Sequence, residues 1–219
     1  MQKNNNTTAY RDSLRLKILS TALSLFKQKG IKAVKMDDIA TEMSISKRTL
    51  YEIYSNKEDL LYECVKYDAE ETRKTNEAYA EIAKNEMDLM AFSLRLKLKD
   101  LESINPLFFT EVHKYSRIVE FLKEDKLRQH EKSRKFMKKG IENGFLRNDI
   151  NYDILDKLGD AAMNCVMQEK LYIDFSLFDI FRTFTFIFLR GCCTEKGLRY
   201  IEKSFRDSII GEIDTDKQQ

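Results

Sequence analysis

Residues 36–54 read MDDIATEMSISKRTLYEIY, and this stretch decides the fold. Apolar residues recur every three or four positions from Met36 to Met43 and again from Lys47 to Tyr54, which predicts two short helices. Ser44-Ile45-Ser46 separates them. Helices this short are unstable alone because helix nucleation is costly, so we expect the two to pack together as one unit.

The spacing within this stretch is typical of a helix-turn-helix. Such a unit needs a small residue where the helices cross, an inward-facing apolar residue in the turn, and apolar residues of the second helix that face the first. Ala40 is the expected small residue and Ile45 the expected turn residue. Leu50 and Tyr54, with Ile39, complete the predicted core.

The outward face of the second short helix is polar. It consists of Lys47, Arg48, Thr49, Tyr51 and Glu52. Such side chains donate hydrogen bonds to phosphates and base edges, and an Arg at this position can bridge O6 and N7 of guanine. Ser46 is the predicted N-cap of this helix.

The rest of the chain also indicates helices. Residues 11–29 carry apolar side chains at helical spacing (Leu14, Ile18, Ala22, Leu25 and Phe26), and Gly30 provides the left-handed stop. Asn56 or Ser55 is expected to cap the next helix. The 219 residues include only 7 Gly and 1 Pro, and no segment alternates like a strand, so the fold class is predicted to be all-α. Further helices are expected at 57–83, 86–102, 106–114, 117–143, 152–171, 177–190 and 195–207.

Composition excludes several classes of protein. The longest stretch without a charged side chain is nine residues, 18–26, too short for a membrane span, and residues 1–10 lack the apolar core of a secretory signal, which predicts a cytoplasmic protein. The four cysteines (Cys64, Cys165, Cys192 and Cys193) show no metal-ligand spacing and are expected to be reduced thiols. We predict no metal, no cofactor and no catalytic residues, because no nucleophile–base pair, ligand cluster or phosphate loop is visible.

The net charge of +2 is unevenly distributed: residues 1–60 carry +4 and the remainder −2. A basic N-terminal module fits nucleic-acid contact, although a solvated helix face would look the same. The basic run 132–139 is interpreted as a solvated face, with a second nucleic-acid patch as the alternative. The adjacent Cys192 and Cys193 are interpreted as idle thiols, with a redox switch as the alternative.

Residues 11–62 resemble the DNA-binding domain of the TetR family of transcriptional regulators. The resemblance rests on Gly30, Met36-Asp37-Asp38-Ile39-Ala40, Ile45 to Tyr51, Tyr54 and Asn56 to Leu61. It implies an all-α protein with a polar, disordered N-terminus (1–10), a helix-turn-helix DNA-binding domain (11–56), a helical ligand-binding and dimerisation domain (57–208) and a polar tail (209–219). It also implies that Tyr51 and Lys57 grip phosphates, and that Lys47, Arg48 and Thr49 face bases or phosphates.

Two positions depart from the family pattern. The family usually has Thr, as N-cap of the first short helix, where this chain has Lys35, so the cap is missing unless Asp37 or Asp38 substitutes for it. The family usually has Gly where this chain has Ser44. We therefore expect Ser44 to adopt a positive φ, at a cost of about 1 kcal/mol.

The resemblance also implies the roles of the C-terminal helices. We expect a homodimer formed through 152–171 and 177–190, with interface residues Leu158, Ala162, Phe181, Phe184 and Phe188. Met and aromatic residues elsewhere predict an apolar ligand pocket. Its expected lining is Met87, Met90, Phe92, Phe108, Phe109, Met163 and Met167, with His113 and Tyr115 as polar contacts. The alternative interpretation is that these residues only fill the core of a helical bundle.

Together these features predict a ligand-responsive regulator, a repressor that binds a palindromic operator on double-stranded DNA as a dimer and responds to a small apolar or amphipathic effector. The alternative is a helical protein–protein interaction module that uses the helix-turn-helix as a protein contact.

Overall fold

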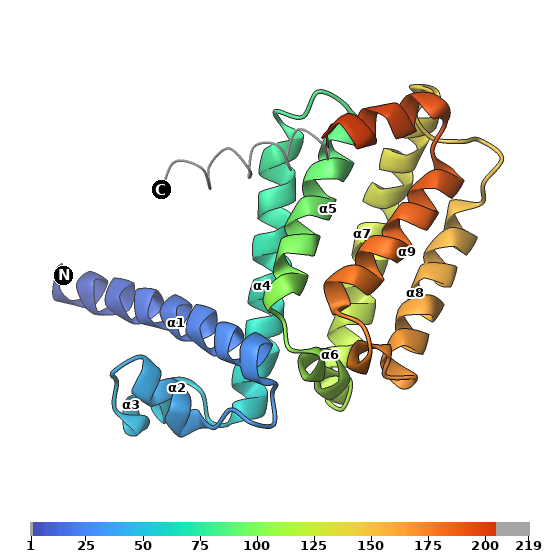
Figure 1. The fold of residues 1–219 in the computed structure, drawn as a ribbon. Helices are drawn as coiled ribbons and strands as arrows, with labels where there is room; N and C mark the ends of the chain where they lie inside the picture. Colours follow the sequence, from blue (N-terminus) through green and yellow to red (C-terminus); the bar gives the residue numbers. More distant parts are fainter. Residues whose placement is uncertain (1, 205–219) are drawn as a thin grey trace, which may run out of the picture. The chain divides into compact units, whose positions relative to one another are not determined.

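The computed structural model describes the backbone of residues 2–204 and the side chains of residues 10–204. This part of the chain is helical (Figure 1), and its one β feature is an isolated bridge between Leu146 and Cys193, so the all-α prediction is confirmed. The helices are α1 (Gln2–Lys29), α2 (Met36–Glu42), α3 (Lys47–Ile53), α4 (Lys57–Ala80), α5 (Glu86–Ser103), α6 (Pro106–Val112), α7 (Ser116–Glu142), α8 (Tyr152–Gln168), the 3-10 turn η1 (Leu171–Ile173) and α9 (Leu177–Cys192). A further helix covers residues 195–204.

Several boundaries differ from the sequence prediction: α4 ends at Ala80 rather than at 83 and α6 ends at Val112 rather than at 114, and three further differences follow. The backbone of α1 is helical from Gln2, within the segment expected to be disordered. The helix expected over 152–171 ends at Gln168, because Lys170 adopts the left-handed conformation with a φ of 53°. Helix α9 continues through Gly191 to Cys192. The expected polar tail, 209–219, lies outside the described residues.

The chain divides into two compact units. The first contains residues 1–74 and 103–124, and the second contains residues 75–102 and 125–219. Helices α4 and α7 contribute residues to both. The first unit thus includes more than the expected 11–56 domain, because α4 up to Lys74, α6 and the first residues of α7 also belong to it.

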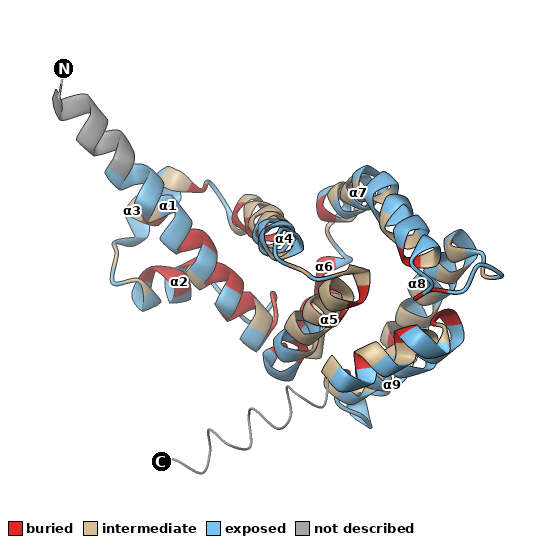
Figure 2. Ribbon diagram, turned by 90° about the horizontal axis from the view of Figure 1, so that it is seen from above, coloured by how far each residue is buried: buried red, intermediate tan, exposed pale blue. Residues whose placement is uncertain are grey.

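The core of the first unit is formed by α1 and the helices packed around it. Ile18, Ala22 and Phe26 of α1 are fully buried, as the predicted apolar face requires. They share one cluster with apolar residues of α2, α3, α4 and α6. Figure 2 shows the buried positions as stripes on α1 and α2. Gly30 ends α1 with the predicted left-handed φ, here 84°.

Among the described residues, the second unit has a smaller core than the first, located where α7 and α9 end. Met87, Phe145, Leu146, Leu189 and Ile201 are among its buried members. A Cβ at Gly197 would lie 2.3 Å from the carbonyl oxygen of Phe145, so only glycine fits there. Buried Cys192 and Cys193 belong to the same core, and all four cysteines are free.

Crossing a membrane demands a longer and more apolar helix than any found among the described residues.

Candidate functional site

The turn between α2 and α3 is built as the sequence predicts. Ser44 has a φ of 53°, which confirms the expected left-handed residue. The backbone N–H of Ser44 donates to the carbonyl of Thr41 at 3.0 Å, and that of Ile45 donates to Ala40 at 3.0 Å. These bonds close α2 and direct the chain into α3.

The two short helices begin differently. Lys35 provides no side-chain cap, but Oδ2 of Asp38 accepts a hydrogen bond of 2.8 Å from the backbone N–H of Lys35. Asp38 thus satisfies the N–H of the N-cap residue itself, whereas no side chain replaces the Thr that would accept from the first turn of α2. Ser46 caps α3 as predicted, because its hydroxyl oxygen accepts from the N–H of Thr49 at 3.0 Å.

The predicted core of the helix-turn-helix is observed. Ile39, Ala40, Leu50 and Tyr54 are buried, and Ile45 is partly buried against the same cluster. Since these side chains fix the rotation of α3, they also decide which of its residues reach solvent.

The outward face of α3 carries the predicted polar set: Lys47, Arg48, Tyr51 and Glu52 are exposed, and Thr49 is half-buried with its hydroxyl 2.7 Å from that of Ser46. Nζ of Lys47 lies 2.7 Å from Oδ1 of Asp37 and 5.9 Å from the ring centre of Tyr51. Nε of Arg48 lies 2.9 Å from Oε1 of Glu52. The hydrogen bond from Lys47 to Asp37 raises the pKa of that ammonium group, and Glu52 raises the pKa of Arg48 in the same way. The face therefore presents two permanent cations beside an aromatic hydroxyl.

Lys57 has a role that the sequence pattern does not reveal. Its Nζ donates hydrogen bonds of 2.7 Å to the carbonyl oxygens of both Ile31 and Val34, in the loop between α1 and α2. Burial lowers the pKa of Lys57, against the opposing effect of Glu111 and Asp38. Two of its three donors hold this loop, which leaves one for another acceptor.

Glu111 of α6 also has a structural role that the sequence did not indicate. It is buried, and its Oε2 accepts a 2.7 Å hydrogen bond from the backbone N–H of Lys32. The N–H of Asn105, the cap of α6, donates to the carbonyl of Lys27 at 2.7 Å. Helix α6 is thus bonded to the end of α1 and to the loop that Lys57 also holds. The sequence offered one signal for this role, namely that Glu111 is the single charged residue in the stretch FFTEV, 108–112.

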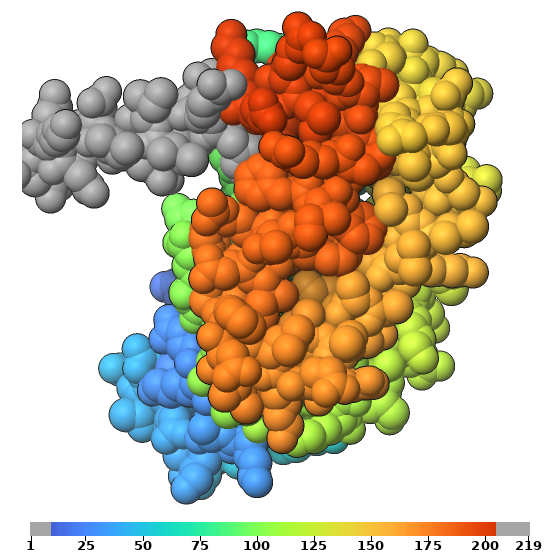
Figure 3. Space-filling model, turned by 45° about the vertical axis from the view of Figure 1, so that its right-hand side comes forward, coloured from blue at the N-terminus to red at the C-terminus, as the bar shows by residue number. Residues whose placement is uncertain are grey.

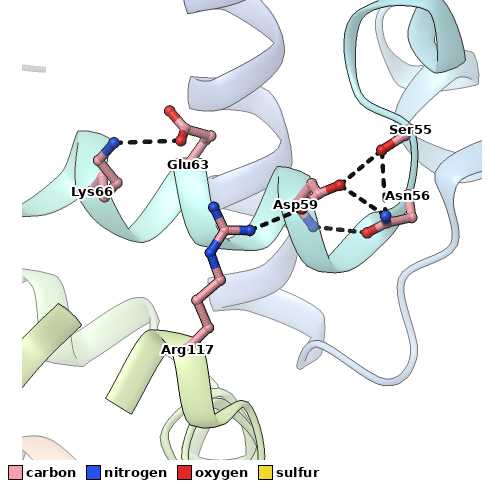
Figure 4. Close-up of polar contacts among 6 residues, drawn as sticks. All are labelled: Ser55, Asn56, Asp59, Glu63, Lys66 and Arg117. Carbon is pink, nitrogen blue, oxygen red and sulfur yellow. Dashed lines mark hydrogen bonds and ion pairs between the residues drawn. The ribbon is translucent and has the colours of Figure 1, made fainter. Parts of the chain in front are cut away.

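The start of α4 is fixed by a network shown in Figure 4. Asn56 is the N-cap, because its Oδ1 accepts from the N–H of Asp59 at 2.9 Å. Oδ2 of Asp59 accepts from Ser55 at 2.7 Å and from Asn56 at 2.8 Å, while Arg117 of α7 donates to Oδ1 at 2.9 Å. Two members of this network, Ser55 and Asn56, directly follow Tyr54, the C-cap residue of α3.

The residues expected to form one apolar pocket are distributed over both units. Phe108, Phe109 and Tyr115 pack in the core of the first unit, and His113 is exposed. In the second unit, Met87 and Met90 pack in its core, and Phe92 stacks on Tyr79 with 3.8 Å between ring centres. Met167 is half-buried on α8. Met163 alone of the nine lines the cleft described next.

That cleft lies between α7 and α8 in the second unit, with α9 contributing to its floor, and has a volume of about 1170 Å³. We name it the α7–α8 cleft. Its floor is apolar and includes Met137, Leu155, Met163, Phe184 and Phe188. Its rim is polar: the cations Lys126 and Arg134 and the imidazole of His130, all of α7, are opposed by Asp153, Asp156 and Asp160 of α8.

The five expected interface residues lie in different environments. Leu158 is 56% exposed, whereas Ala162 and Phe181 are half-buried. Phe184 and Phe188 line the α7–α8 cleft, with 4.1 Å between their ring centres. Helices α8 and α9 also have a side that does not line the cleft. In Figure 3 these two helices, drawn in orange tones, face the viewer. Exposed residues at helical spacing on them are Ile154, Leu158, Ala161 and Cys165 of α8, and Thr183 and Ile187 of α9. We name this set the outer α8–α9 face.

Comparisons with known proteins agree with this architecture. The family model for "Bacterial regulatory proteins, tetR family" matches residues 18–64. A search of curated protein sequences finds no match.

Solved structures share the fold. A protein from Saccharomonospora viridis in complex with choline is similar at a TM-score of 0.67 and 20% identity, over 84% of this chain and 100% of that one. A TetR transcription regulator from Haloarcula marismortui reaches 0.63 at 13% identity, over 84% and 100%. A TetR-family regulator from Agrobacterium tumefaciens reaches 0.63 at 15% identity, also over 84% and 100%.

Proposed function

We propose that this chain, which has the N-terminal domain and the fold of TetR-family transcriptional regulators, is a ligand-responsive repressor that binds a palindromic operator as a homodimer. The observation that carries the proposal is the exposed face of α3. A cap at Ser46 and a core at Leu50 hold this helix so that Lys47, Arg48 and Tyr51 lie on its exposed face, with Thr49 half-buried beside them, where they can approach the major groove.

The side chains of this face divide into two kinds of contact. Arg48 is 89% exposed and can reach base edges once it leaves Glu52, so it is the candidate for reading guanine. Lys47, Tyr51 and the third donor of Lys57 are candidates for phosphates, which position the protein without reading sequence. Thr49 can serve either role.

A second copy of the chain is the proposed partner of the outer α8–α9 face. Leu158 and Ile187 are large apolar side chains exposed on two adjacent helices, and a two-fold dimer buries the same face on both copies. A dimer also meets the demand of two operator half-sites, whose recognition helices must lie about 34–36 Å apart.

Release of DNA would follow from a ligand that favours another separation of the two recognition helices. Support for a small-molecule effector comes from the second unit's cleft and from the choline complex of the structural neighbour. A protein that binds operator DNA works in the cytoplasm, so the proposed location depends on the same function.

Selection of bound fragments from the source genome, followed by fluorescence anisotropy on the selected site at two salt concentrations, tests the proposal. We expect one palindromic site bound by a dimer, with affinity that falls steeply as salt rises. Absence of any selected DNA, with α3 intact, would favour the alternative of a protein contact made through the helix-turn-helix.

A further inference from the structure

Three carboxylates of α8 and two permanent cations of α7 face each other across the α7–α8 cleft. Nζ of Lys126 lies 3.0 Å from Oδ2 of Asp156 and 2.5 Å from Oδ2 of Asp160. The contacts of the third carboxylate are longer: Asp153 lies 3.3 Å from Nε2 of His130 and 3.9 Å from Arg134. With one ammonium shared by two carboxylates, negative charge is in excess at the Asp156–Asp160 end of the rim.

Gly159 gives access to the floor at this same end. Asp156, Gly159, Asp160 and Met163 follow one another at helical spacing, so all four lie on the side of α8 that lines the cleft. A Cβ at Gly159 would meet only Cζ of Phe184, at 4.0 Å. Because glycine has no side chain, the rings of Phe184 and Phe188 are reached directly past the two carboxylates.

From this arrangement we propose that the α7–α8 cleft binds an organic ammonium ion with an apolar body, its charged head between Asp156 and Asp160 and its body on Phe184, Phe188 and Met163. Carboxylates and aromatic faces both attract a cation, and ring faces favour an alkylated ammonium that is weakly hydrated. The thioether of Met163 adapts to varied apolar shapes. The proposal rests on the proposed function in one respect only, since it names the chemical class of the effector.

The bound cation would exchange places with the ammonium group of Lys126. Burial lowers the pKa of this ammonium, but the hydrogen bonds to Asp160 and Asp156 outweigh it and raise the pKa overall, so the two carboxylates already hold a cation. The Lys126 side chain is 47% exposed and can move into solvent on its flexible stem. The exchange leaves the net charge beside the two carboxylates unchanged. The favourable free energy of binding then comes from burial of the apolar body of the ligand.

A chain-matched series of probes tests the charge preference by isothermal titration calorimetry on the full chain without DNA. The probes are decyltrimethylammonium, decanol and decanoate, each below its aggregation or solubility limit. We expect the cation to bind at least about tenfold more tightly than the neutral and anionic probes. Equal binding of decanol or decanoate, or no binding of the cation, would overturn the proposal.

Two variants separate the specific site from a general loosening of the cleft. Asp156→Asn/Asp160→Asn should weaken binding of the cation by about tenfold or more, whereas Lys126→Met should strengthen it, because it removes the competing ammonium and keeps both carboxylates. Disruption of the ion pairs alone would change both affinities in the same direction, and that result would refute the assignment. Gly159→Leu should block binding by filling the entrance to the floor.

Glu131→Gln/Glu169→Gln is the matched control, since it removes two exposed carboxylates outside the cleft. Circular dichroism of each variant verifies that it is folded. The calorimetry uses no DNA, so a chain that binds decyltrimethylammonium but no genomic fragment would contradict the proposed function and leave the cleft assignment intact. A chain that binds an operator but no cation would do the reverse.

Discussion

Nζ of Lys57 and the carbonyl oxygen of Val34 lie 2.7 Å apart, so the first residue of α4 is bonded to the end of the loop that leads into α2. A second bond of equal length joins the same ammonium to Ile31. The side chain that the family resemblance assigns to phosphate contact therefore also holds the helix-turn-helix against α4.

Lys57→Met keeps the length of the side chain and removes both hydrogen bonds. We expect it to lower the free energy of unfolding by about 1–3 kcal/mol, because two carbonyls lose a charged donor. Urea denaturation without DNA measures this. Lys74→Met, which removes an exposed pair with Glu71, is the control and should change stability by less than about 1 kcal/mol.

The same Lys57→Met variant tests the third donor of the ammonium. If it grips one phosphate in each half-site, the slope of log affinity against log salt should fall by roughly 2 for the dimer. We expect this fall in anisotropy titrations at several salt concentrations. An unchanged slope would leave Lys57 with its structural role alone.

Ser44→Gly should be neutral or stabilise the protein by up to about 1 kcal/mol. The φ of 53° is strained for serine and unstrained for glycine, although glycine also gains freedom in the unfolded chain. Urea midpoints of the two proteins measure the difference. Marked destabilisation would mean that the serine side chain contributes more than the strain costs.

Stability should depend on pH through Asp59. Its hydrogen bond from Ser55, together with those from Arg117 and Asn56, lowers the pKa of this carboxyl below its ordinary value. A lowered folded-state pKa contributes stability that is present above the ordinary pKa and is lost as pH falls through the folded value. Asp59→Asn should thus be less stable than the wild type at neutral pH, and the two should converge below about pH 4.

Urea midpoints from pH 7 to pH 2.5 measure this convergence. Glu81→Gln removes an exposed carboxylate in the turn after α4 and should follow the wild-type curve. A constant gap between Asp59→Asn and wild type over the whole range would show that the carboxylate charge is not what stabilises the cap.

Local patterns were sufficient to predict the helix-turn-helix. The cap at Ser46 and the burial of Leu50 depend on neighbours within a few residues, so sequence spacing contains the necessary information, whereas the positive φ of Ser44 was expected from the family resemblance. Gly30 and the Asn105-Pro106 pair also marked helix boundaries correctly, whereas Gly191 did not, because α9 continues through it. The break near Lys170 was missed because lysine gives no local signal for a left-handed conformation.

Contacts between distant residues could not be predicted. Lys57 bonds to residues 23 and 26 positions away, and Glu111 bonds to Lys32 across 79 positions, so no local pattern indicates either contact.

The orientation of helix α9 could not be predicted for a different reason. Apolar residues surround it on several sides, so its periodicity did not distinguish the cleft-lining Phe184 from the exposed Ile187.

This distinction matters for the proposed dimer. Leu158→Glu and Ile187→Glu each place a charge on the outer α8–α9 face, where the side chains are 56% and 65% exposed, and should yield folded monomers. Ile82→Glu changes an isoleucine that is 75% exposed in the turn after α4 and should remain dimeric. Sedimentation velocity separates the species. Dimers that persist in both α8 and α9 variants would move the interface elsewhere.

Arg48 and Glu52 decide how the recognition face reads bases. Nε of Arg48 lies 2.9 Å from the carboxylate of Glu52, one turn further along α3. Arg48→Ala should relax the preference at one position of each half-site and cost about 1–3 kcal/mol on the preferred sequence, with little loss on sequences altered there. Glu52→Gln should raise affinity for all sequences, because it frees the guanidinium and removes a negative charge near the phosphates. Anisotropy on a set of operators with single base-pair changes measures both effects. Equal losses on every operator for Arg48→Ala would reassign this residue to a phosphate, and a specific loss in Glu52→Gln would mean that Glu52 itself contacts a base.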